Sequence, residues 1–164
     1  MTAILGSNLV LYEEEFERIK SVLARLWVDA NAKIVFLVDK NGQQIAAHGN
    51  LGQVDATSLA SLTAGNVAAT DGLAKLIGEK EFSILFHEGE KDNIHISIVG
   101  QRLILVVIFD ERSSLGLVRL RVRKSAAELE DILSQMANKA ATGETPASPF
   151  AEITDDDIDA LFSE

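Results

Sequence analysis

The feature that most constrains the fold is a set of three strand-length apolar segments joined by links too short to hold a helix. The segments are residues 82–88, 93–99 and 103–110, and the links are 89-GEKD-92 and 100-GQR-102. Parallel strands need a crossover of about a dozen residues or more, whereas links of this length are typical of hairpins. The sequence therefore predicts three consecutive antiparallel strands.

A second antiparallel pair precedes these strands. The segment 33-KIVFLVD-39 has the length and continuous apolar character of a buried strand, and 43-QQIAAHG-49 follows it after Asn41-Gly42. Asn-Gly between two such runs is the strongest short-range hairpin signal. Farther on, isoleucine occupies every second position of 93-NIHISIV-99, which is the period of a half-buried strand.

Two helices are predicted before the last three strands. The first runs from about Glu13 to Asn31, where apolar residues recur every three or four positions on one face. The second follows Asp55, its expected N-cap, and stops at Gly78.

A third helix is predicted over residues 115–138. Its first residues alternate as a strand would, but a longer helical stripe favours one continuous helix. The order of elements is then αββαβββα. It predicts an α+β domain over residues 1–138, with a five-stranded antiparallel sheet and three helices packed on it.

The third helix carries a basic group near its first half: Arg119, Arg121, Arg123 and Lys124. Bases near a helix N-terminus oppose the helix dipole at a modest cost, so an acidic neighbour is expected to offset them. Two interpretations stay open. The group is a solvated face, or it is an electrostatic site for an acidic partner, for polarity proteins or for higher assembly of dimers.

The second helix carries an unusual row of small residues. Ala60, Ala64, Ala68 and Gly72 follow one another at steps of four, with Gly65 beside them. Glycine costs a helix roughly 1 kcal/mol relative to alanine, so two interior glycines predict that another backbone approaches closely. The larger residues of this helix are expected to face the sheet instead, namely Leu59, Leu62, Asn66, Leu73 and Leu76.

The strand over 82–88 follows this helix directly. If it lies at a sheet edge, pairing with its own copy joins two sheets and sets the two small-residue helices side by side. The sequence thus predicts a two-fold homodimer.

Composition excludes several classes of protein. The net charge of −10 argues against nucleic acid as a partner, and no segment reaches the ~20 apolar residues of a membrane-spanning helix. No signal peptide or cysteine is found, which favours a cytoplasmic protein without disulfides or thiolate metal sites. A metal site built from His48, His87 and His95 is the weaker interpretation, because scattered surface histidines are more usual.

The C-terminal part is predicted to be separate from the domain. Residues 139–149 are rich in Ala, Thr, Gly and Pro and are typical of a flexible linker. Residues 150–164 hold six acids and no base, and predict an arm that folds as a short helix against a partner. Its expected docking residues are Phe150, Ile153, Ile158, Leu161 and Phe162. A solubilising acidic terminus is the alternative.

Three stretches together resemble Roadblock/LC7 domains: 35-VFLVDKNGQQIA-46, 59-LASLTAGNVAATDGLAKLIGE-79 and 103-LILVVIFDERSSLGLVRLR-121. The resemblance implies a profilin-like fold that dimerises through its second helix and third strand. It further implies GTPase activation of an MglA-like Ras-family GTPase, with one GTPase bound per dimer and contacts at Ala64 and Ala68. The five small residues of the second helix named above are therefore the expected GTPase-binding residues. The arginines of the chain would stay outside the GTPase active site, and the chemistry would belong to the partner.

The same resemblance implies that the acidic arm docks on the GTPase, or on another polarity protein, and that the protein concentrates at a cell pole. No nucleotide-binding motif and no cofactor site are found in the chain itself. A non-catalytic scaffold that binds a small GTPase is the main alternative. A small-molecule sensor is a third hypothesis, for which the sequence offers no pocket of convergent polar groups.

Overall fold

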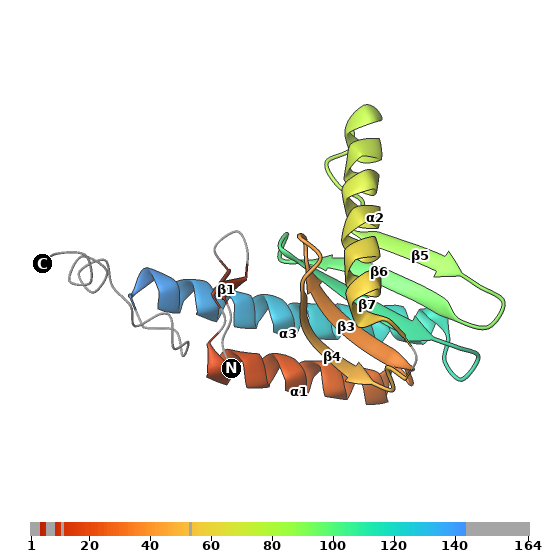
Figure 1. Cartoon of the computed structure of the whole chain (residues 1–164), viewed down its shortest axis with the longest axis horizontal. Helices are drawn as coiled ribbons and strands as arrows, with labels where there is room; N and C mark the ends of the chain where they lie inside the picture. The colour runs from red at the N-terminus through yellow and green to blue at the C-terminus, as the bar shows by residue number, and fades with distance from the viewer. Residues whose placement is uncertain (1–3, 6–8, 11, 53, 144–164) are drawn as a thin grey trace, which may run out of the picture.

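A computed structural model describes residues 4–5, 9–10, 12–52 and 54–143 of the chain (Figure 1). Its main sheet has five antiparallel strands in the order β4-β3-β7-β6-β5. The strands are β3 (Ile34–Asp39), β4 (Gln44–Gly49), β5 (Ile84–Glu88), β6 (Asn93–Val99) and β7 (Leu103–Phe109). The helices are α1 (Glu13–Asp29), α2 (Ala56–Leu76) and α3 (Leu115–Ala141).

The predicted α+β class and the order αββαβββα are confirmed. A short antiparallel ribbon of β1 (Ile4–Leu5) and β2 (Leu9–Val10) precedes them and was not predicted. Strands of two residues are too short for any alternation to be visible in the sequence.

The helices cover opposite faces of the sheet. Helices α1 and α3 pack together on one face, and α2 crosses the other, as Figure 1 shows. Strands β3 and β7 lie inside the sheet and are buried on both faces. This explains why their sequences are continuous apolar runs instead of alternating ones.

Strand β6 differs from its prediction as a half-buried strand. Its isoleucines face α2, but the opposite side of the strand is also covered, because α3 lies over it. His95 and Ser97 are therefore buried polar residues beneath α3. Sequence alternation could not show this, because a polar side chain in a strand is normally read as solvent-facing.

The predicted turns and caps are present. Asp55 accepts a hydrogen bond from the backbone N–H of Ser58, and the hydrogen bonds from Ser58 lower the pKa of its carboxyl group. Gly42 and Gly78 adopt φ values of +89° and +79°, at the Asn-Gly hairpin and after α2. Helix α3 continues past its expected end at residue 138 to Ala141, because 139-KAA-141 contains good helix formers.

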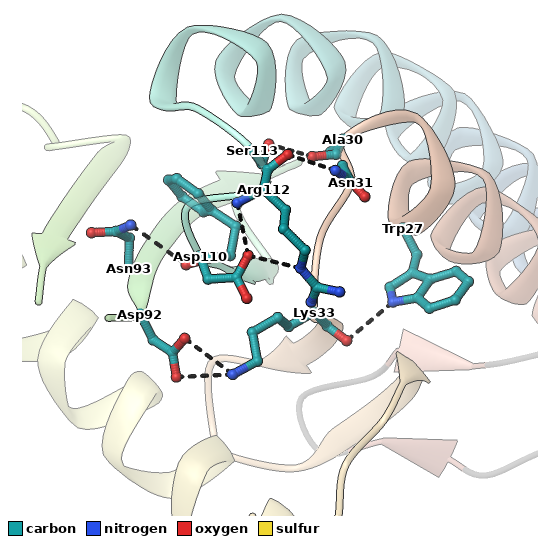
Figure 2. Close-up of polar contacts among 10 residues, drawn as sticks. Trp27, Ala30, Asn31, Lys33, Asp92, Asn93, Asp110, Arg112 and Ser113 are labelled. Atoms are coloured by element: carbon teal, nitrogen blue, oxygen red, sulfur yellow. Dashed lines mark hydrogen bonds and ion pairs between the residues drawn. The ribbon is translucent and has the colours of Figure 1, made fainter. Parts of the chain in front are cut away.

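Polar contacts tie three turns together at one end of the sheet (Figure 2). The Lys33 ammonium group bonds both carboxylate oxygens of Asp92 at 3.0 and 3.1 Å, linking the start of β3 to the β5–β6 turn. Asp110 accepts from the backbone and side chain of Arg112, which holds the pKa of its carboxyl group below the usual value. This cluster orders loops and leaves Arg112 engaged within its own chain.

Candidate partner-binding surface on α2

The side of α2 that faces the sheet is built from small residues. Ala60 and Ala64 are only 1% and 8% exposed, and they pack with Val67 over β3, β6 and β7. Small side chains let the helix backbone lie close to the strands, where the helix covers the apolar face of the sheet. Two of the five predicted GTPase-contact residues, Ala60 and Ala64, are therefore occupied within the chain itself.

The predicted core face of α2 is wrong for three of its leucines. Leu62, Leu73 and Leu76 are 73%, 59% and 83% exposed, while Leu59 packs partly on the core as expected. The sequence interpretation assumed that the largest apolar residues of a helix face their own sheet. In α2 the arrangement is reversed, with small residues inside and large apolar residues outside.

The remaining predicted contact residues lie on the outer surface. Gly65, Ala68 and Gly72 are exposed, and a Cβ added at either glycine would meet no atom within 4 Å. Nothing within the described chain therefore requires glycine at these two positions. The inference that the glycines admit a close approach then applies only to a second polypeptide.

Helical geometry separates the outer surface into two stripes. At about 100° per residue, Leu62, Leu73 and Leu76 fall within an arc of about 60°. Next to this leucine stripe, on one side, is Asn66, whose amide bonds the ring of His87 on β5 at 2.9 Å. On the other side is the small-residue stripe of Gly65, Ala68 and Gly72. The leucine stripe therefore lies on the β5 side of α2.

Strand β5 is an edge strand of the sheet, which meets the condition set above for pairing with its own copy. The segment before it adds further exposed apolar residues, Ile77 and Phe82, and Ile84 of the strand itself is 48% exposed. Exposed apolar area and an unpaired strand edge thus occur on the same side of the molecule. Exposed apolar residues beside an unpaired strand edge are a common feature of interaction surfaces.

The basic group of α3 lies on the sheet face opposite α2 and is divided. Arg119 and Arg123 line a cleft between α3 and the β5–β6 edge, whereas Arg121 and Lys124 are not among its lining residues. Within the described residues, none of the four forms an ion pair, although Glu130 lines the same cleft as Arg119 and Arg123.

The three histidines do not converge. His48 contacts the ring of Trp27, His87 bonds Asn66, and His95 is buried beneath α3. The described residues contain no group of three or more metal-ligand side chains, and none of the described helices has the length and apolarity to cross a bilayer. The predicted docking residues of the acidic arm, 150 to 162, lie outside the described residues.

Comparison with known proteins identifies the domain. A family model described as the Roadblock/LC7 domain matches residues 18–109. The structure of Myxococcus xanthus MglB is similar at 62% sequence identity, with 78% of this chain and 96% of that chain covered and a TM-score of 0.74. Comparison with curated protein sequences gives no match.

Two further MglB structures are similar at lower identity. The gliding protein MglB from Thermus thermophilus is 34% identical, with 80% and 99% of the two chains covered and a TM-score of 0.74. An MglB described with a tetrameric arrangement is 33% identical over the same shares, with a TM-score of 0.75. An Acanthamoeba castellanii profilin, at 12% identity and a TM-score of 0.52, shares the fold alone.

Proposed function

This chain belongs to the Roadblock/LC7 family and is a homologue of MglB, and from that premise we propose that it activates GTP hydrolysis by an MglA-like Ras-family GTPase. The observation that carries the proposal is the 62% identity to Myxococcus xanthus MglB over 78% of this chain. The role would be to confine active GTPase in cell polarity or motility, and the chemistry would occur in the GTPase.

The acting species is proposed to be a homodimer with one GTPase bound. The leucine stripe of α2 and the free edge of β5 lie on the same side and would meet their copies across a two-fold axis. The small-residue stripe then stays accessible beside the dimer contact. Gly65, Ala68 and Gly72 would let a GTPase backbone approach α2 closely.

The proposed mechanism uses no inserted arginine. Helix α2 contains no arginine, Arg112 is held by Asp110, and the basic group of α3 lies on the opposite sheet face. The dimer would instead bind the hydrolysis-competent conformation of the GTPase preferentially, with catalytic residues from the GTPase itself.

Conformational selection limits the size of the acceleration. If the competent conformation makes up about 0.1–10% of the free GTPase, binding can raise the rate by only roughly 10- to 1,000-fold. An arginine finger supplies about 10³–10⁵-fold. The measured acceleration therefore separates the two mechanisms.

The test is GTP turnover by an MglA-type GTPase with and without this protein at saturating concentration. An acceleration of roughly 10- to 1,000-fold, the range expected for conformational selection, supports the proposal. Unchanged turnover together with nucleotide-insensitive binding would identify the scaffold alternative.

The acidic arm, residues 150–164, is proposed to dock on the GTPase, and a chain ending at residue 143 should then bind it more weakly.

Ala68→Arg is the matched probe of the GTPase surface. Ala68 is exposed, so arginine there should abolish GTPase binding and leave the fold and dimer intact. Ala64→Arg is a poor probe, because Ala64 is buried against the sheet and the larger side chain would displace α2. Ala137→Arg, at an exposed alanine on α3, is the control and should retain activation.

A further inference from the structure

A cleft of ≈ 380 Å³ opens between α3 and strands β5 and β6, on the sheet face opposite α2. His95 and Ser97 come from β6, and Arg119 and Arg123 come from α3. We call it the His95 cleft. Its size falls in the range of small-ligand sites, about 300–1,000 Å³.

The polar atoms of β6 in this cleft have unmet hydrogen-bonding capacity. His95 is 1% exposed, and neither of its ring nitrogens has a hydrogen-bond partner among the described residues. The same holds for the hydroxyl group of the buried Ser97. Buried groups of this kind are normally satisfied in native proteins, because leaving them unbonded destabilises the fold. Three such atoms in one cleft point to a bound molecule.

The charges around the cleft specify the sign of that molecule. Arg119 and Arg123 are one helical turn apart on the same side of α3, and neither pairs with a described acid. Glu130, one acid against two arginines, also lines the cleft. Burial, with a smaller contribution from Arg119, lowers the pKa of His95, so its ring is neutral and offers one donor and one acceptor.

We propose that the His95 cleft binds a small organic oxyanion, a carboxylate or a phosphate ester with an apolar body. The anionic group pairs with Arg119 and Arg123, since guanidinium groups match both oxyanions geometrically. The apolar body packs against Ile84 and Val122, which also line the cleft. Polar atoms of the ligand bond His95 and Ser97. The site is separate from α2 and does not depend on the proposed GTPase function.

The test follows the ring nitrogens of His95 by NMR in the full chain. The sequence has three histidines, so single His→Gln variants assign every imidazole signal. Phenyl phosphate and benzoate are titrated in parallel, with inorganic phosphate as the probe that lacks an apolar body. The proposal predicts a saturable shift of the His95 signals with a Kd of about 1 mM or tighter for at least one aromatic probe. The tighter of the two identifies the natural oxyanion class.

Matched variants separate a built site from general charge attraction. The double variant R119Q/R123Q should weaken binding by about tenfold or more, because it removes two charge-assisted contacts. The control R121Q/K124Q removes the same charge from the same helix outside the cleft and should bind normally. Far-UV circular dichroism checks that both variants keep the fold.

Three results would overturn the proposal. One is the absence of any saturable shift at His95, and another is equal weakening by both double variants. The third is a His95 signal that changes with protein concentration in step with self-association measured by sedimentation, which would show that a second copy fills the cleft. Equal affinity for inorganic phosphate and phenyl phosphate would overturn the apolar part of the ligand assignment.

Discussion

Replacing Leu76 by aspartate should separate the proposed dimer without unfolding the chain. Leu76 is 83% exposed near the C-terminus of α2 and contributes little to the core of its own chain. Full burial of a leucine stabilises an association by about 1.5–3 kcal/mol, so covering its exposed part in both protomers contributes about 2.5–5 kcal/mol. At 1.4 kcal/mol per factor of ten, the dimer dissociation constant should rise by roughly two to three and a half orders of magnitude.

The assay is sedimentation velocity over a concentration series, with thermal unfolding followed by circular dichroism. The control is Val28→Asp, which places the same charge at a valine that is also exposed, on α1 at the opposite sheet face. The control should dimerise as the unmodified chain does. The reasoning is refuted if Leu76→Asp leaves the association unchanged, or if Val28→Asp weakens it equally.

Three further substitutions, the last with a matched control, provide independent tests. Gly72→Ala should raise the free energy of unfolding of the isolated chain by about 0.5–1 kcal/mol, because alanine favours the helix and its Cβ would meet no atom within 4 Å. Denaturant titration measures this change, and a variant of equal or lower stability would contradict the prediction. Gly49→Ala should lower the free energy of unfolding by at least about 2 kcal/mol, since Gly49 has a φ of +117° and a Cβ would collide with neighbouring backbone. An unchanged stability would show that the backbone does not require glycine at this position. Lys139→Met should lower the melting temperature because it leaves Glu15, which is 2% exposed and 2.5 Å from the Lys139 ammonium group, without that cation. The control Lys20→Met removes the cation of an exposed ion pair on α1 and should leave the melting temperature unchanged. Equal decreases in melting temperature for the two variants would contradict the claim that Lys139 stabilises the fold by pairing with the buried Glu15.

The fold could be predicted because local signals agreed with one another. The Asn-Gly hairpin, the short links of the last three strands and the helical stripes all indicate the same antiparallel sheet, and the structure has it. Each of these signals comes from residues that are close together in the chain, and periodicity and turn residues record such local geometry in a single sequence.

The orientation of α2 could not be predicted for a physical reason. Hydrophobic periodicity shows that Leu62, Leu73 and Leu76 prefer to be buried, but it does not show whether the burying surface belongs to the same chain. The sequence interpretation assigned them to the core, and in the structure they are exposed while Ala60 and Ala64 take their place. The error came from assuming that the largest apolar residues of a helix always face the sheet of their own chain.

The His95 cleft was missed for a related reason. The alternation in β6 correctly places its isoleucines on the α2 face, but it cannot show that α3 crosses the opposite face. The pocket of convergent polar groups, which the sequence did not offer, depends on the contact between β6 and residues 119–130 of α3. Contacts between segments that distant in the chain are not encoded in local periodicity.

The central claim is that a pair of these chains, joined through the leucine stripe of α2, is the species that activates the GTPase. The most direct measurement titrates the protein into a fixed amount of GTP-loaded MglA-type GTPase, well above the dissociation constants, and follows phosphate release. The account predicts a rate that rises to a plateau at two chains per GTPase, and almost no rise for Leu76→Asp at the same concentrations. A plateau at one chain per GTPase, or full activation by the Leu76→Asp chain while it remains monomeric, would contradict it.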